Sequence, residues 1–357
     1  MESILNRLHS IRPTAYSRTR NFSNGAVTRL GPYISRGVIT TRMVYDQIRE
    51  MNIPWKQAEK LVQELAWRDY WQNIWIDKGE EINQDLRNKQ FPVSSSEIPN
   101  AIVHAQTGID AVDSAIEKLY DTGYMHNHMR MYVASICCNL AQCHWLTPAK
   151  WLYSHLLDGD VGSNQLSWQW VCGSNSNKKY YANQSNINRY FNSSQKKTFL
   201  DVSYEVLSSM EVPEVLRKTI KPQFDENLPN NSTSNLEKGR ATVIYNYYNL
   251  DPFWHRNESV QRVFLIEPSV FAKYPISKKC MDFALQLGSN IPELNVYVGE
   301  FDALQNELQT KEIVFKEHPL NRHYNGQEEP RKWLTNTSGY HRSFFAFWKK
   351  CKKELEW

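Results

Sequence analysis

The sequence lacks the features that mark secreted, membrane-spanning and metal-cluster proteins. Its 357 residues contain no apolar run of the 18 or more residues that a membrane helix needs, and its start has no apolar region of signal-peptide length. The six cysteines form no CxxC pair, which argues against a zinc or iron–sulfur site and favours reduced thiols in the core. We therefore expect a soluble, cytoplasmic protein with no metal and no membrane partner.

Charge is spread unevenly along the chain, although its net value is only +4. Residues 1–50 carry eight arginines and no lysine, and residues 161–200 carry five basic residues and no acid. Both segments are candidate anion-binding faces, because arginine suits bidentate contacts to phosphate; a solvated basic surface is the alternative. The 12 tryptophans exceed what a core needs, which indicates stacking surfaces or a buried aromatic ligand.

The length predicts two domains, at roughly 150 residues per domain. Apolar residues recur at helical spacing from about 54 to 170, and residues 203–235 contain three prolines and resemble a solvated spacer. A predicted helix covers Lys278–Leu287 and ends at Gly288. Strand-like runs occupy Thr242–Tyr248, Arg262–Glu267, Asn295–Glu300 and Glu312–Lys316. We expect a mainly α fold: a helical domain over residues 1–236, then a small α/β domain with a largely parallel sheet over residues 237–357.

One predicted helix displays an unusual polar and aromatic face. In QELAWRDYW, Glu64, Trp67, Arg68 and Trp71 fall at i, i+3, i+4 and i+7, so a carboxylate, a guanidinium and two indoles share one side. An ordinary surface ion pair beside two half-buried tryptophans is the alternative interpretation.

A second constellation follows the helical stretch. Asp158 and Asp160 flank a glycine, Asn164 follows, and then come Trp168 and Trp170. Acceptors and amides packed with indoles suit a heteroaromatic ligand that carries ring N–H and carbonyl groups. The alternative is a common DGD turn followed by two core tryptophans on a strand.

The charged residues of this region need partners. Arg130 shares a predicted helical face with Asn127 and Met131, and it would lie among apolar neighbours, as would Asp158 and Asp160. Burying such charges is costly unless they pair, so their joint presence indicates a polar pocket.

Several motifs together resemble the flavin-binding helical domain of the DNA photolyase and cryptochrome family. They are WRDYW, TGYMHNHMRM, Trp145 fourteen residues after Met131, LLDGDVGSNQLSWQW and FNSSQKKTF, in order and at near-constant spacing between Tyr16 and Phe199. The resemblance implies a U-shaped FAD buried among helices, a hole that admits a flipped pyrimidine dimer, and a basic rim that binds the DNA backbone.

The resemblance also implies which residues hold FAD. The VTRLG segment is similar to the family's TSRLS turn; Thr28 keeps a hydroxyl there, whereas Val27 and Gly31 do not. Asp160 matches the acceptor for the isoalloxazine edge, and Asn164 matches the residue that faces flavin N5. The full set of matching positions is Tyr16, Thr28, Arg29, Leu30, Arg68, Arg130, Asp158, Asp160 and Asn164.

The lesion site is matched in the same way. Glu64 and Asn127 match the pair that hydrogen-bonds the lesion, and Met131 matches a methionine that packs on it. Photolyases that act on (6-4) lesions carry histidines at the positions of Asn127 and Met131, so the resemblance favours cyclobutane dimers. The remaining predicted DNA contacts are the aromatic walls Trp67 and Trp170 and the basic residues Lys196 and Lys197.

This chain departs from the family pattern in its antenna region and in its electron-transfer chain. We expect no antenna domain before the helical one, although RVFLIEPSVF and ELNVYVGEFDAL faintly resemble part of that domain, displaced toward the C-terminus. Trp168 and Trp145 match the inner two tryptophans of the family's electron-transfer chain, but no tryptophan lies near Phe91, where the outermost is expected. Trp151 or a tyrosine is a candidate replacement, and an ordinary core position is the alternative for Trp151.

The leading hypothesis is therefore a deoxyribodipyrimidine photolyase, a light-driven, FAD-dependent enzyme that acts on DNA containing pyrimidine dimers. The first alternative is a cryptochrome-like blue-light photoreceptor without repair activity. The second is a nucleic-acid-binding scaffold that holds no flavin.

Overall fold

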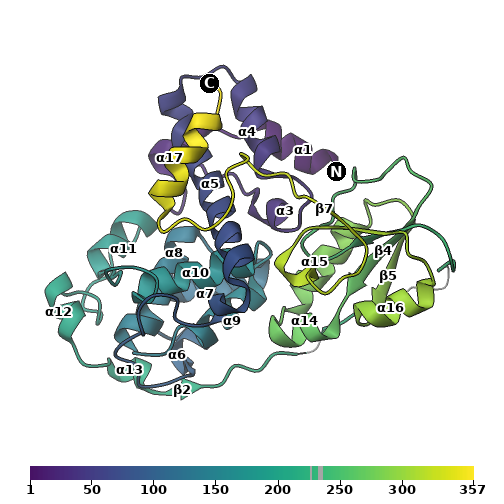
Figure 1. Cartoon of the computed structure of the whole chain (residues 1–357). Helices are drawn as coiled ribbons and strands as arrows, with labels where there is room; N and C mark the ends of the chain where they lie inside the picture. Colours follow the sequence, from purple (N-terminus) through teal and green to yellow (C-terminus); the bar gives the residue numbers. More distant parts are fainter. Residues whose placement is uncertain (226, 232–235) are drawn as a thin grey trace. The chain divides into compact units, whose positions relative to one another are not determined.

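The computed structural model describes residues 1–225, 227–231 and 236–357, which form two compact units (Figure 1). The first unit comprises Met1–Ile11, Thr28–Asp77 and Phe224–Trp357, and the second comprises Arg12–Val27 and Lys78–Gln223. Parts of the expected spacer, at residues 226 and 232–235, lie outside the described residues. Among the described residues, no helix is long and apolar enough to cross a membrane.

The second unit is built almost entirely from short helices. A two-residue antiparallel pair, β1 (Ile98–Pro99) with β2 (Thr219–Ile220), is the exception to the expected all-helical character. The helices of this unit are α2 (Pro13–Thr19), η1 (Gly79–Asn83), α6 (Asn100–Val103), α7 (Asp110–Thr122), α8 (Asn127–Ser135), η2 (Ile136–Leu140), α9 (Leu146–His155), α10 (Val161–Cys172), α11 (Gln184–Phe191), α12 (Tyr204–Ser209) and α13 (Glu214–Arg217).

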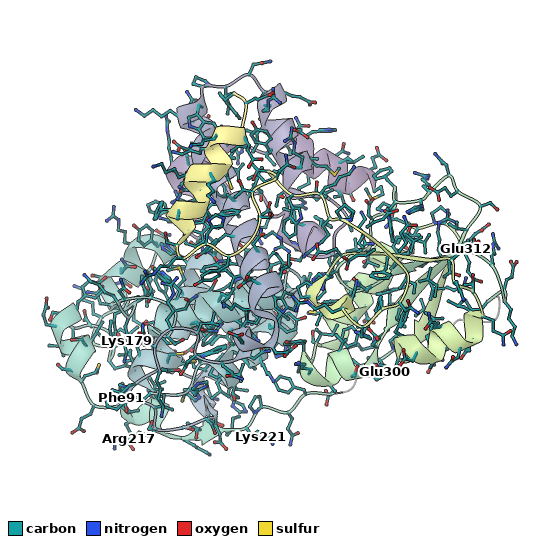
Figure 2. All side chains as sticks on the ribbon, viewed as in Figure 1. Phe91, Lys179, Arg217, Lys221, Glu300 and Glu312 are labelled. Atoms are coloured by element: carbon teal, nitrogen blue, oxygen red, sulfur yellow. The ribbon has the colours of Figure 1, made fainter. Side chains whose placement is uncertain are left out.

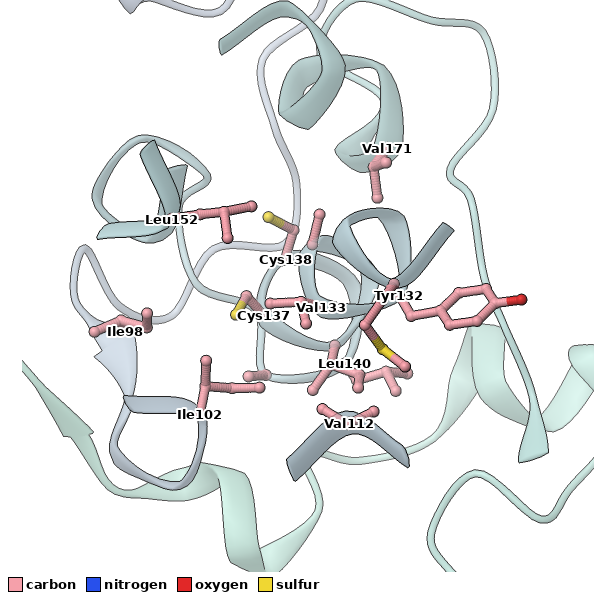
Figure 3. Close-up of a cluster of buried hydrophobic side chains, with 14 of the residues drawn as sticks. Ile98, Ile102, Val112, Tyr132, Val133, Cys137, Cys138, Leu140, Leu152 and Val171 are labelled. Carbon is pink, nitrogen blue, oxygen red and sulfur yellow. The ribbon is translucent and has the colours of Figure 1, made fainter. Parts of the chain in front are cut away.

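An apolar cluster forms the core of this unit, and α8 with its continuation η2 runs through it. Figure 3 shows Val133, Cys137 and Cys138 surrounded by side chains from α6, α7, α9 and α10. Both thiols are free, and complete burial raises their pKa well above the ordinary value. These cysteines therefore act as small apolar core residues.

The first unit contains a doubly wound parallel sheet with the order β5-β4-β3-β6-β7. Helices α15 and α16 pack on opposite faces: Gly288 of α15 adjoins Phe264, whereas Phe301 and Leu304 of α16 cluster with Val263. The strands are β3 (Thr242–Tyr245), β4 (Gln261–Ile266), β5 (Leu294–Val298), β6 (Ile313–Lys316) and β7 (Gln327–Glu329). The accompanying helices are α14 (Pro268–Lys273), α15 (Lys278–Gly288), α16 (Phe301–Leu308) and η3 (Pro319–Asn321).

The first unit also contains helices from both ends of the chain. They are α1 (Glu2–His9), α3 (Gly31–Ser35), α4 (Thr41–Glu50), all but the last residue of α5 (Trp55–Lys78), and α17 (Phe344–Glu354). Helix α17 packs on α5, where Tyr70 and Phe347 have ring centroids 5.6 Å apart. Asp69 of α5 also accepts a hydrogen bond from the Leu334 backbone N–H at 2.8 Å.

The expected mainly α class with a small parallel α/β domain is confirmed, with two differences in detail. A fifth strand, β7, extends the sheet, and the chain after it returns to α5 instead of staying with the sheet. Packing, not chain order, defines the compact units, so the predicted boundary after residue 236 stays a prediction.

Candidate functional site

An ion pair between Arg130 and Asp158 forms the centre of the candidate site in the second unit. Arg130 Nη2 donates to both carboxylate oxygens of Asp158 at 2.9 Å, and its Nε donates to the Met125 carbonyl at 2.9 Å. Each of the paired side chains is 21% exposed. Helix α8 therefore presents a guanidinium whose orientation is set on two sides and which keeps part of its surface exposed.

The start of α10 carries the other polar groups of this site. Asp160 is the N-cap, and its Oδ1 accepts from the Ser163 backbone N–H at 2.7 Å. Asn164 donates through Nδ2 to the Ala149 carbonyl at 2.9 Å. The Ser163 hydroxyl is buried and has no hydrogen-bond partner within the described part of the chain. Ser163 was not predicted from the sequence. Its position in the first turn of a helix capped by an aspartate could have indicated it.

The two tryptophans predicted to relay electrons are both buried in the core of the second unit. Trp168 is 2% exposed and Trp145 is not exposed at all. The Trp145 indole N–H donates to Asp85 Oδ1 at 2.8 Å, and His144 Nε2 lies 3.8 Å from the same oxygen. Asp85 was not predicted, because it lies 60 residues from Trp145 and no motif marks it.

The position expected for the outermost tryptophan is at the surface. Phe91 is 79% exposed, and Figure 2 labels it among the side chains of the second unit. Trp151, the suggested replacement, is 2% exposed, and its indole N–H donates to the Tyr120 hydroxyl at 3.1 Å. Trp151 is therefore a core residue, as the alternative interpretation had it, and Phe91 supplies an exposed ring of a different kind.

Exposed aromatic and basic residues continue along the acid-free segment. Trp170 on α10 is 38% exposed, and its ring centroid lies 5.8 Å from that of Tyr180. Lys178, Lys196 and Lys197 are exposed. Trp168 and Trp170 lie on a helix, so the alternative that placed both on a strand is wrong. Asn127 and Met131 lie on α8 with Arg130, at the spacing that shares a helical face.

Helix α5 carries the predicted residues of the first unit. Glu64 pairs with Lys60 at 3.2 Å, with both side chains 32% exposed. Trp67 stacks on Phe344 of α17, with centroids 3.7 Å apart and 8° between the ring planes. Arg68, one residue further, is half-buried. Phe344 thus covers one face of the Trp67 indole, the predicted lesion wall, and this contact was not predicted from the sequence.

The predicted diphosphate segment has a left-handed residue at its centre. Arg29 is exposed with a φ of 58°, and Leu30, 1% exposed, caps α3. The Leu30 backbone N–H donates to Thr28 Oγ1 at 3.3 Å, so this hydroxyl already holds the turn. Tyr16 lies on α2 of the second unit, whereas residues 28–30, 64, 67 and 68 belong to the first.

Comparisons with known proteins agree with the resemblance. Residues 61–237 match the family model described as the FAD binding domain of DNA photolyase. The chain is 31% identical over 154 residues to the deoxyribodipyrimidine photo-lyase of Streptomyces griseus, covering 43% of this chain and 33% of the relative. It is 29% identical over 192 residues to cryptochrome DASH of Synechocystis, covering 52% of this chain and 38% of the relative.

A solved structure, the cryptochrome of Synechocystis, is also similar, with 27% identity and a TM-score of 0.49 over 53% of this chain and 42% of that one. The matches span only about a third of the length of the curated relatives. Residues 61–237 of the chain are thus similar to the FAD binding domain of DNA photolyase, and FAD is the cofactor that this similarity supports.

The residues at the start of α10 fit such a cofactor. A heteroaromatic ring with N–H and carbonyl groups needs both donors and acceptors in a partly apolar setting. The buried Ser163 hydroxyl has no partner in the described chain, Asp160 caps the same helix, and Asp158, the partner of Arg130 on α8, lies five residues before Ser163 in the chain. These groups, with Asn164, are the residues of this unit that could hold FAD.

Proposed function

We propose that this protein is a light-driven enzyme that uses FAD to split cyclobutane pyrimidine dimers in DNA. The single observation that carries the proposal is the Arg130–Asp158 ion pair within a segment of the photolyase FAD-binding family. It is supported by relatives named deoxyribodipyrimidine photo-lyase, at 26–31% identity.

The chain's own residues have distinct parts in this proposal. FAD, when bound in its reduced form and excited by light, would supply the electron that opens the dimer and would take it back once the ring has split, so that there is no net redox change. Glu64 and Asn127 hydrogen-bond the lesion, and their contacts strengthen as negative charge develops on it. Met131, Trp67 and Trp170 provide the apolar and aromatic surfaces that hold flipped bases.

The solvent exposure of these side chains is consistent with their proposed roles in substrate binding. Asn127 is exposed at the first residue of α8, and Trp170 keeps 38% of its surface open at the far end of α10. Glu64 is half-buried, and Lys60 holds it on α5.

A cryptochrome-like photoreceptor is the second candidate, because several relatives are named cryptochrome DASH. Both candidates need FAD and a relay of aromatic residues, for which we propose Trp168 and Trp145. Only the repair enzyme needs Glu64 and Asn127 to act on a lesion.

The test is a Glu64→Ala variant, first checked for normal FAD content and then assayed for dimer splitting under blue light with FAD chemically reduced beforehand. We expect repair to fall on the order of 10- to 1000-fold if Glu64 behaves as a transition-state hydrogen-bonding group. Glu59→Ala, on the same helix and paired with Lys352 at 3.5 Å, is the matched control and should repair normally. Unchanged repair in Glu64→Ala would remove its assignment, and no repair by the wild type would favour the photoreceptor.

A further inference from the structure

The C-terminal helix α17 has two different faces, and one of them is used inside the first unit. Its rings stack on α5: Phe344 on Trp67 at 3.7 Å, and Trp348 on Trp55 at 6.3 Å with 17° between the planes. The buried face, at i, i+3, i+4 and i+7, consists of Phe344, Phe347, Trp348 and Cys351.

The opposite face of α17 is basic and aromatic. Phe345 is 68% exposed, and Lys349 and Lys353 follow it at i+4 and i+8, with Lys350 beside them. Of the helix's lysines, Lys352 pairs with Glu59 at 3.5 Å. The other three, all exposed, have no ion-pair partner in the described parts of the chain.

Helix stability does not account for this arrangement. Cations in the last turn interact favourably with the helix dipole. This interaction accounts for the positions of Lys352 and Lys353 but not for those of Lys349 and Lys350. Like charges at i, i+3 and i, i+4 repel, so Lys350 and Lys349 each weaken the helix slightly against Lys353. A face that concentrates unpaired ammonium groups next to an exposed ring suits an anionic polymer with aromatic bases.

We propose that the exposed face of α17 binds the phosphate backbone of DNA beside the lesion site. The inference rests on the proposed function, because Trp67, the residue on which Phe344 stacks, is the proposed wall for flipped bases. A lipid surface fits less well, since an interfacial helix inserts an apolar face and the apolar face of α17 is already buried against α5.

The test measures binding to an undamaged DNA duplex at several salt concentrations. We expect Lys349→Glu/Lys350→Glu to reduce the slope of log K against log salt by about 1.8, at roughly 0.9 per lost phosphate contact. Lys278→Glu/Lys279→Glu on α15 makes the same change in net charge at another exposed helical site and should keep the wild-type slope. Lys349→Gln/Lys350→Gln removes the charges without reversing them and should shift the slope in the same direction.

An unchanged salt slope in both α17 variants would overturn the inference. An equal change of slope in the α15 control would also overturn it, because the effect would then depend on net charge alone. Loss of binding to phosphatidylserine vesicles with unchanged DNA binding would overturn it in favour of a membrane surface. Dimer splitting is measured separately. If the wild type splits no dimers but the α17 variants still lower the salt slope of DNA binding, the proposed enzyme activity is refuted and the DNA-binding face is supported.

Discussion

Asp69 of α5 should make the stability of the protein depend on pH in an unusual direction. Its carboxylate is 5% exposed, accepts the Thr41 hydroxyl at 3.1 Å and the Leu334 N–H at 2.8 Å, and ties the C-terminal segment to α5. Desolvation by burial raises the pKa of Asp69 to about 6 from 3.8, and the two hydrogen bonds lower it by less. The folded protein therefore holds this proton more tightly than the unfolded chain does.

The sign and size of the effect follow from linkage. Because the folded-state pKa is the higher one, the stabilising contribution of the protonated group is fully present below pH 3.8 and is lost as pH rises through about 6. A difference of about two pKa units corresponds to roughly 3 kcal/mol, at 1.36 kcal/mol per unit. Asp69→Asn carries no such titration, so the wild type should lose about 3 kcal/mol relative to this variant between about pH 3 and about pH 7.5.

Urea unfolding of both proteins, followed by the helical circular dichroism signal, checks this difference at each pH. Asp282→Asn is the matched control: Asp282 is 55% exposed and pairs with Lys278 on the surface of α15. It should track the wild type across the range. If the difference in unfolding free energy between the wild type and the Asp69→Asn variant stays constant within about 0.5 kcal/mol, burial does not raise this pKa as argued.

Two further outcomes are expected. Asp158→Ala should cost roughly 2–4 kcal/mol, below the range for a fully buried pair because both side chains are 21% exposed, and should release FAD; full FAD retention by the purified variant would contradict the assignment. Lys196→Glu/Lys197→Glu should lower the salt slope of DNA binding by about 0.9 per lost contact, and an unaltered affinity would identify a merely solvated surface.

The local features of the fold could be predicted from the sequence. Helix α15 has the predicted start and differs by one residue at its end, and four strands lie within a few residues of their predicted positions. Apolar residues form short runs along these strands and recur at helical spacing along α15, and such patterns can be read from a short stretch of sequence. Strand β7 could not be found this way, because Gln327–Glu329 is a short polar edge strand with no apolar period.

The candidate site was partly predictable for a related reason. The cost of burying lone charges indicates that Arg130, Asp158 and Asp160 need partners, but it does not say which carboxylate pairs with Arg130; in the structure that partner is Asp158. The contact of Asp85 with Trp145 could not be predicted. Nothing in the sequence around a carboxylate in an irregular segment indicates which distant indole it contacts. Partners that are distant in the chain are chosen by packing.

Helix α17 shows how such a distant partner bears on function. Its apolar period is visible in the sequence, but its partner α5 lies more than 250 residues earlier, so the period alone predicts a buried face without saying what covers it. The stack of Phe344 on Trp67 supplies that answer, because it covers one face of the indole that is the proposed wall for flipped bases. The C-terminal segment therefore takes part in shaping the Trp67 wall of the proposed lesion site, although it is distant from α5 in the sequence.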